Sequence, residues 1–113
     1  MSRRVDGVNA WLWQRLSALY LGGFLIYLIT ILLCSGTMTF IQWQQWLADP
    51  VHSTLILIGF VMLFIHAWIG IKDVAIDYIS SLLLRSIVLM LLGLAFMVAL
   101  VWSSRILILV LIQ

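Results

Sequence analysis

Three long apolar runs determine what this chain can fold into. Each run approaches the roughly 20 residues that a helix needs to cross a bilayer core about 30 Å thick, and we place the spans at about 11–34, 53–73 and 83–104. Hydrophobic residues make up 65% of the 113 residues and charged residues only 9%, a balance typical of membrane proteins. The sequence therefore predicts an all-α membrane protein with three transmembrane helices, organised as a single domain over residues 1–113.

The two connections between the spans differ in length. The first is polar and is expected to be a loop, marked by Gly36, Gln42, Gln44, Gln45, Asp49 and Pro50. The second is much shorter and runs from Ile79 to Leu82. Tryptophans near the expected ends of the spans are typical of membrane interfaces, where amphipathic rings are stable; they are Trp11, Trp13, Trp43, Trp46 and Trp102.

The distribution of positive charge predicts which ends face the cytoplasm. Basic residues lie near the N-terminus and beside the second connection, at Arg3, Arg4, Arg15, Lys72 and Arg85, whereas the first connection has none. We therefore expect a cytoplasmic N-terminus and a C-terminus on the opposite side. Arg105 disagrees with this pattern. The apolar tail 106–112 fits either a partner surface or a longer, tilted span.

Composition also argues against several other functions and signals. The six basic residues form no dense patch, so nucleic-acid binding has no support. The single cysteine, Cys34, has no partner for an internal disulfide, and we expect an inert thiol. Arg3 and Arg4 suggest a twin-arginine leader, but Asp6 and Gly7 stand where apolar residues would follow, and the first span is too long for a signal peptide. We expect that span to be retained.

His66 is the most unusual residue within the spans, because an ionisable ring surrounded by hydrocarbon is costly. At about 100° per residue, one narrow helical stripe holds Gly59, His66, Gly70, Asp73 and Asp77. The glycines leave a notch that admits either a close-packed helix or the flat face of a macrocycle. His66 therefore either hydrogen-bonds an adjacent helix or is an axial ligand of haem iron through its neutral imidazole.

A six-coordinate haem would need a second ligand from another chain. The only other histidine in the sequence is His52, which precedes His66 by 14 residues on the same expected helix. This spacing corresponds to roughly 21 Å along the helix axis. One iron cannot bind both rings.

Two further groups lie at the expected cytoplasmic ends of the spans. Arg15 either extends to the lipid headgroups or pairs with an anion such as a haem propionate, which its planar guanidinium suits. Tyr78, next to Asp77, either belongs to the aromatic belt beside a solvated carboxylate or donates a hydrogen bond to a ligand carbonyl. The residues alone leave these alternatives open.

The segment from His66 to Gly70, followed by Asp77-Tyr78 and Arg85, resembles the D-type hydrophobic membrane anchor of bacterial succinate dehydrogenase, the cytochrome b subunit of respiratory complex II. The number of spans and the chain length are similar as well. Such anchors are not catalytic on their own and act as subunits of the enzyme complex. The resemblance implies an inner-membrane anchor, with its C-terminus periplasmic, that assembles with the C-type anchor, an iron–sulfur subunit and a flavoprotein subunit.

The resemblance also implies roles for four residues. His66 would supply one axial ligand to haem b, and the C-type anchor the other. Arg15 matches the arginine of the haem propionate region. Tyr78 would hydrogen-bond ubiquinone, with Asp77 beside it, so that electrons from succinate oxidation reach quinone. The alternatives are a fumarate reductase membrane anchor and a cofactor-free structural protein that assembles a membrane complex.

Overall fold

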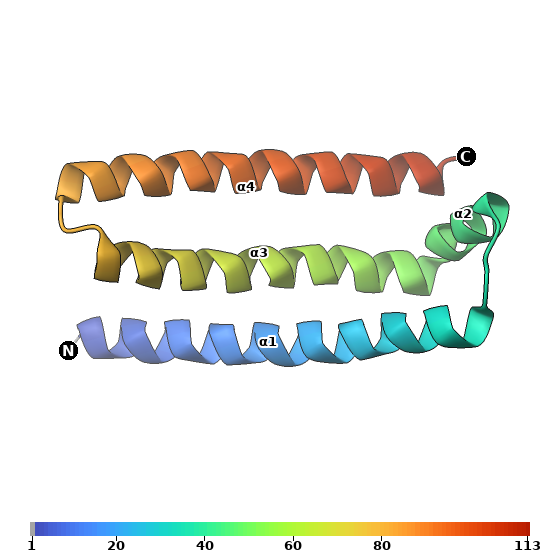
Figure 1. Cartoon of the computed structure of the whole chain (residues 1–113), viewed down its shortest axis with the longest axis horizontal. Helices are drawn as coiled ribbons and strands as arrows, with labels where there is room; N and C mark the ends of the chain where they lie inside the picture. The colour runs from blue at the N-terminus through green and yellow to red at the C-terminus, as the bar shows by residue number, and fades with distance from the viewer. Residues whose placement is uncertain (1) are drawn as a thin grey trace.

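Three long antiparallel helices dominate the computed structural model, which describes residues 2–113, with side chains from Asp6 onward. The helices are α1 (Ser2–Ser35), α2 (Phe40–Ala48), α3 (Pro50–Tyr78) and α4 (Leu82–Leu111). Helix α3 lies between α1 and α4 and packs against both (Figure 1), whereas α1 and α4 make no direct contact within residues 2–113. Three of the helices are long and apolar enough to cross a membrane. The predicted fold class is therefore confirmed.

Each long helix extends beyond the expected apolar span. The candidate spans Asp6–Ser35, Pro50–Tyr78 and Leu82–Leu111 contain 30, 29 and 30 residues. Such helices measure about 45 Å, which exceeds a hydrocarbon core of about 30 Å. Their ends therefore have the length to enter the headgroup regions. The apolar tail after Arg105 is a helical continuation of α4 as far as Leu111, a form that suits both a partner surface and a longer, tilted span.

The first connection contains a helix, α2, and the expectation of a plain loop is wrong over Phe40–Ala48. Thr39 and Gln42 form a reciprocal capping box, in which Thr39 N donates to Gln42 Oε1 (2.8 Å) and Gln42 N donates to Thr39 Oγ1 (3.3 Å). A polar residue taken as a loop marker is thus part of a helix cap. Gly36, with φ +62°, provides the left-handed turn that precedes this cap.

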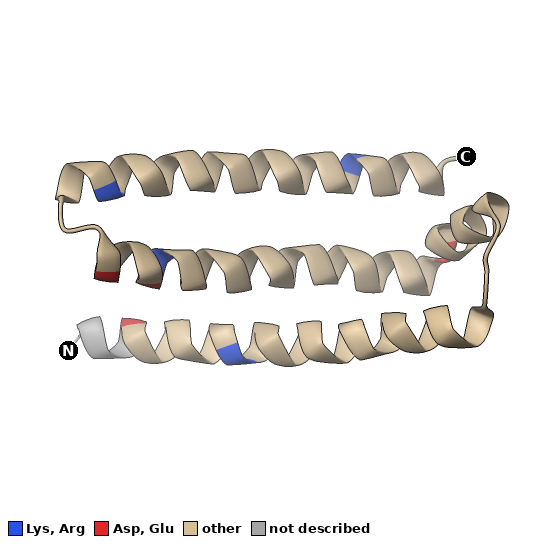
Figure 2. Cartoon of the chain, viewed as in Figure 1, with Lys and Arg blue, Asp and Glu red and all other residues tan. Residues whose placement is uncertain are grey.

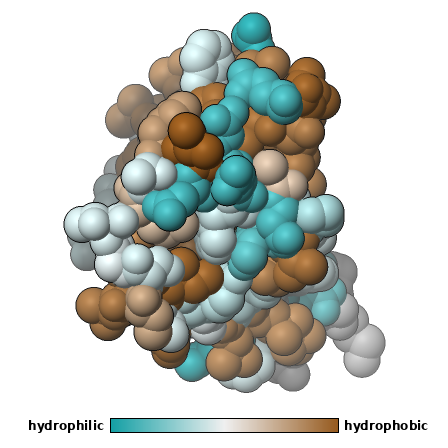
Figure 3. Space-filling model, turned by 90° about the vertical axis from the view of Figure 1, so that its right-hand side faces the viewer, coloured by the Kyte–Doolittle hydropathy of each residue, from teal (hydrophilic) through white to brown (hydrophobic). Residues whose placement is uncertain are grey.

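Aromatic and polar contacts hold α2 against the bundle. The His52 ring stacks on Trp46 with centroids 4.5 Å apart and on Tyr27 of α1 with centroids 6.0 Å apart. Gln44 of α2 donates a side-chain hydrogen bond to Gln113 beyond α4. Figure 3 views this end of the molecule and shows hydrophilic side chains across it, with hydrophobic surface around them. His52 therefore belongs to the α2 end of α3 and lies far along that helix from His66.

Helices α1 and α3 approach closely at Gly59. Gly59 is buried, and a Cβ atom added there would lie 3.4 Å from the ring of Phe24. Beside it, the Tyr20 hydroxyl donates to the carbonyl oxygen of Leu55 at 2.6 Å. Of the two occupants considered for the glycine notch, a close-packed helix is the one found at Gly59.

Most charged residues lie toward the ends of the three long helices (Figure 2), whereas Arg15 lies well inside α1. Lys72, late in α3, and Arg85, early in α4, lie on either side of the α3–α4 connection, which is at the same end as the N-terminus (Figure 1), and Arg105 lies late in α4. The side chains of Arg3 and Arg4, on which the expected orientation also depends, are outside the described part. A cytoplasmic N-terminus stays a prediction from the charge pattern.

Candidate functional site

His66 lies on the face of α3 that packs against α1. Its Nδ1 atom is 3.2 Å from Oγ of Ser17, a residue whose exposed fraction is 0%. Ser17 Oγ also donates to the carbonyl oxygen of Gln14 at 3.0 Å. The hydrogen bond to an adjacent helix, which was one interpretation of His66, is therefore present. It occupies only Nδ1, and Nε2 has no hydrogen-bond partner among the described residues and is not fully buried.

A surface cavity of about 390 Å³ adjoins the imidazole. His66 contributes its wall from α3, and α1 contributes Trp11, Gln14, Arg15 and Ala18. These α1 residues recur at spacings of three and one, the i, i+3, i+4, i+7 pattern that places side chains on a single helical face. The structure thus brings Arg15 and His66 together on one cavity, although 51 positions separate them in the sequence.

Arg15 is exposed, and its guanidinium lies over the ring of Trp11 at 5.4 Å from the centroid. This cation–π contact orients the group without neutralising it. Within the part of the chain whose side chains are described, no carboxylate lies within 4.0 Å of Arg15. The guanidinium donors are therefore available to an anionic group placed in the cavity.

The stripe of residues around His66 is divided between packing and open space. The space beside Gly59 is filled by the aromatic rings of α1, as described above. At Gly70, the nearest atom to an added Cβ would be Nε2 of Gln14 at 3.9 Å. The space beside His66 is thus wider at Gly70, on the side of the cavity, than at Gly59.

The donor set fits a macrocyclic metal group better than a bare metal ion. Among the described residues, no cluster of three or more His, Cys, Asp or Glu side chains is placed to hold a metal. A single imidazole nitrogen suffices for iron that already has four porphyrin nitrogens as ligands, and haem proteins commonly bind through such an axial histidine. Arg15 on the same cavity can pair with a carboxylate of such a group. The residues present therefore fit one half of a haem site.

Tyr78 and Asp77 lie apart from this cavity. Tyr78 is the last residue of α3 and is 84% exposed, and Asp77 is exposed beside it. Twelve residues separate Tyr78 from His66, which corresponds to about 18 Å along the helix. Neither side chain is hydrogen-bonded to another described residue. On this chain, the two groups form an open polar edge at the end of the bundle.

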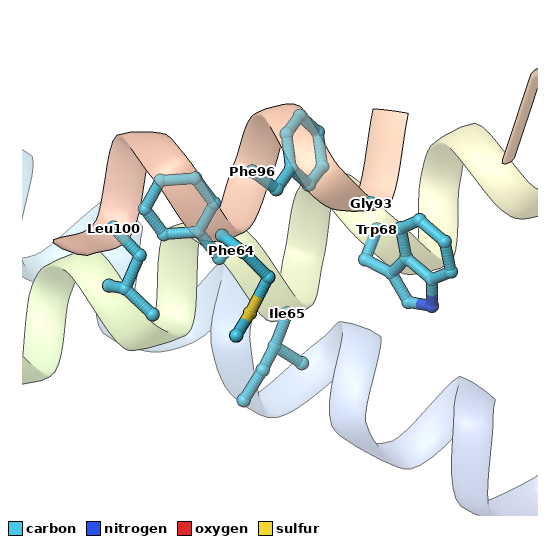
Figure 4. Close-up of a pocket in the computed structure, with 7 residues that line it drawn as sticks. Phe64, Ile65, Trp68, Gly93, Phe96 and Leu100 are labelled. Atoms are coloured by element: carbon cyan, nitrogen blue, oxygen red, sulfur yellow. The ribbon is translucent and has the colours of Figure 1, made fainter. Parts of the chain in front are cut away.

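A second cavity, of about 400 Å³, lies between α3 and α4 (Figure 4). The labelled residues of its wall are Phe64, Ile65, Trp68, Gly93, Phe96 and Leu100. Trp68 packs close to Gly93, where an added Cβ would lie 3.3 Å from the indole. None of these residues carries an imidazole, carboxylate or thiol. This part of the α3–α4 interface is therefore apolar packing surface, whereas the His66 ring faces α1.

Sequence reasoning did not identify three residues of the His66 surroundings. Trp11 was expected only as an interface anchor, and Gln14 and Ser17 were not singled out. Two signals were available in the sequence. Gln14 and Trp11 share a helical face with Arg15, and Ser17 is a polar residue within an apolar span.

Comparisons with known proteins agree with this architecture. A family model described as the succinate dehydrogenase/fumarate reductase transmembrane subunit matches residues 1–103. The chain is also 30% identical, over 80 residues, to the succinate dehydrogenase hydrophobic membrane anchor subunit of Coxiella burnetii (strain RSA 493 / Nine Mile phase I). That alignment covers 71% of this chain and 68% of the relative. The family match includes α1, α2, α3 and most of α4.

Proposed function

The chain belongs to the succinate dehydrogenase/fumarate reductase transmembrane subunit family, and we propose that it anchors a succinate:quinone oxidoreductase in a bacterial inner membrane. The family and the three apolar helices support the anchor role itself. The proposal adds a cytoplasmic N-terminus and an assembly with the C-type anchor, an iron–sulfur subunit and a flavoprotein subunit. Succinate is oxidised on the flavoprotein, and the membrane part delivers the electrons to ubiquinone.

In this proposal, His66 is one axial ligand of haem b, through Nε2, and a residue of the C-type anchor is the other. The observation that carries the proposal is the cavity shared by His66 and Arg15. It places the intramembrane imidazole beside a guanidinium that no described carboxylate neutralises, as a propionate-bearing macrocycle requires. When bound, the haem supplies one-electron redox chemistry. The residues of this chain hold it, orient it and provide a counter-charge.

Tyr78 and Asp77 contribute to the ubiquinone site in the same proposal. The exposed phenol at the end of α3 donates a hydrogen bond to a quinone carbonyl, and this bond orients the head-group and favours the charge that develops on its oxygen. Asp77 is exposed beside Tyr78, and its carboxylate shapes the polar edge at which the head-group binds.

The family description also names fumarate reductase, and an anchor for that enzyme is the second candidate. The same haem and quinone sites would then pass electrons in the opposite direction. This direction is set by the reduction potentials of centres in the other subunits. A cofactor-free assembly protein is the alternative that the next experiment excludes or establishes.

The test is the His66→Leu variant in the complex purified with all of its subunits. We expect the absorption spectrum of low-spin b-type haem to be lost or altered, since Leu offers no nitrogen ligand. His52→Leu is the matched control, because His52 lies on the same helix and stacks on Trp46 at the α2 end. An unchanged spectrum with full haem content in the His66 variant would remove His66 as a ligand, whereas a wild-type complex without any b-type haem absorption would establish the cofactor-free alternative.

A further inference from the structure

We propose that Ser17 is the positioning residue for His66: its buried hydroxyl accepts a hydrogen bond from Nδ1–H, and this bond selects the imidazole tautomer whose Nε2 lone pair faces a ligand. The inference rests on the proposed function of His66 and assigns its orientation and basicity to a residue of α1. Ser17 and His66 come from different helices, 49 positions apart in the sequence.

The hydroxyl of Ser17 has a single proton, which decides the direction of both hydrogen bonds. Its Oγ atom lies 3.0 Å from the carbonyl oxygen of Gln14, an atom that can only accept. If the proton pointed to His66, two oxygen lone pairs would face each other at that distance. With the proton on the Gln14 side, Ser17 Oγ can only accept from His66, so Nδ1 carries the hydrogen at 3.2 Å. Nε2 is then the unprotonated nitrogen of the neutral ring.

Burial makes this arrangement stable. Ser17 is fully buried, so water cannot replace either of its partners. Its backbone belongs to α1, which is held against α3 by the nearby bond from Tyr20 to the Leu55 carbonyl (2.6 Å). The acceptor is therefore fixed in position relative to α3, and it constrains the rotation of the imidazole about its own side-chain bonds.

An acceptor on Nδ1–H also increases electron donation from Nε2. A hydrogen bond to the outer nitrogen of a ligating histidine orients the ring and raises its basicity. A more basic axial ligand favours the ferric state over the ferrous state, so it lowers the reduction potential of the bound iron. Ser17 is thus expected to affect the reduction potential of the bound iron as well as the orientation of the imidazole ring.

The experiment compares Ser17→Ala and Ser17→Thr in the complex purified with all subunits, using redox titration of the haem absorption. We expect a more positive midpoint potential in Ser17→Ala, because the acceptor is lost, and a shifted electron paramagnetic resonance spectrum of the ferric haem. Ser17→Thr keeps a hydroxyl, so its midpoint potential and its electron paramagnetic resonance spectrum should both be close to those of wild type. Ser53→Ala is the matched control, since Ser53 is also buried and donates to the carbonyl three residues earlier, Pro50 O at 3.2 Å, but lies 13 positions before His66, at the α2 end of α3.

The outcomes separate this inference from the proposed function. If His66→Leu removes the haem while Ser17→Ala keeps the wild-type potential and spectrum, the ligand assignment stands and the role of Ser17 is overturned. If Ser17→Thr shows the same shift as Ser17→Ala, the hydroxyl is not the cause, and the role is overturned as well. Haem loss in Ser17→Ala that Ser17→Thr restores supports the inference. Full haem retention in His66→Leu would instead refute the proposed function.

Discussion

Replacing Tyr78 with Phe removes one oxygen atom from the proposed ubiquinone site and changes little else. Tyr78 is 84% exposed and forms no hydrogen bond with another described residue. Exposed substitutions of this kind usually change stability by less than about 0.5 kcal/mol. The folded chain should therefore be unaffected, and any functional loss should come from the missing contact to quinone.

The size of the functional loss depends on whether the quinone carbonyl oxygen finds another hydrogen-bond donor. Under the proposed function, the other subunits cover this edge in the complex and shield the quinone carbonyl from water; leaving that buried carbonyl unpaired costs about 1–3 kcal/mol. At about 1.4 kcal/mol per factor of ten, succinate:ubiquinone reductase activity of Tyr78→Phe should fall by about one to two orders of magnitude. Succinate oxidation with an artificial acceptor that bypasses the membrane site should be nearly unchanged.

Tyr27→Phe is the matched control for this experiment. Tyr27 lies on α1 and stacks on His52 near α2, far along the bundle from the end of α3. Both activities of this variant should equal those of wild type. Equal losses in the two assays of Tyr78→Phe would indicate an assembly defect, and retention of full quinone reduction would remove Tyr78 from the site.

Two further predictions concern the haem half-site and the α1–α3 contact. The chain purified alone and folded in detergent should show no bis-histidine haem spectrum, because His52 and His66 lie 14 residues apart on one helix; a stoichiometric bis-histidine spectrum from a demonstrated monomer would refute this. Tyr20→Phe should lower the thermal stability of the complex only slightly, by the equivalent of about 0.6 kcal/mol, because the Leu55 carbonyl keeps its bond within α3. A large drop in the melting temperature, relative to Tyr27→Phe, would contradict that reasoning.

The transmembrane helices were predictable because hydropathy acts over many residues. Backbone polar groups in a bilayer must be satisfied internally, so a long apolar run has few folds available. The helix ends were not predictable in the same way. The expected third span ended at about 104, whereas α4 continues to Leu111, because Arg105 near a membrane interface does not interrupt a helix.

Helix α2 shows that a polar segment between two membrane spans can be a helix when its composition suggests a loop. Glutamines between two apolar runs suggest a loop, yet Gln42 completes the capping box with Thr39 that starts α2. The helix is then held by contacts with its neighbours: Trp46 stacks on His52 of α3, and Gln44 bonds to Gln113, which is 69 positions away in the sequence. Such tertiary contacts leave no local signal in the sequence.

The titratable residues of the candidate site could be predicted from the sequence, but the residues that hydrogen-bond to them could not. His66 stands out because an ionisable ring in hydrocarbon calls for an explanation. Ser17 is polar but is a weaker signal than His66, because a hydroxyl within a membrane helix normally bonds to its own backbone, as Thr30 does with Ile26 O at 2.8 Å. Only the pairing of α1 with α3 brings Ser17 to His66.

Under the proposed function, the half-site makes this chain dependent on a partner. Ala75 and Leu107 are the buried apolar residues among those described, so the three helices enclose almost no core of their own. In lipid, apolar contact gives helices little driving force to associate. A haem with one ligand from each of the two anchors would supply that missing connection, because it binds tightly only when both chains are in place. Under the proposed function, haem content then measures assembly of the membrane domain as well as its redox capacity.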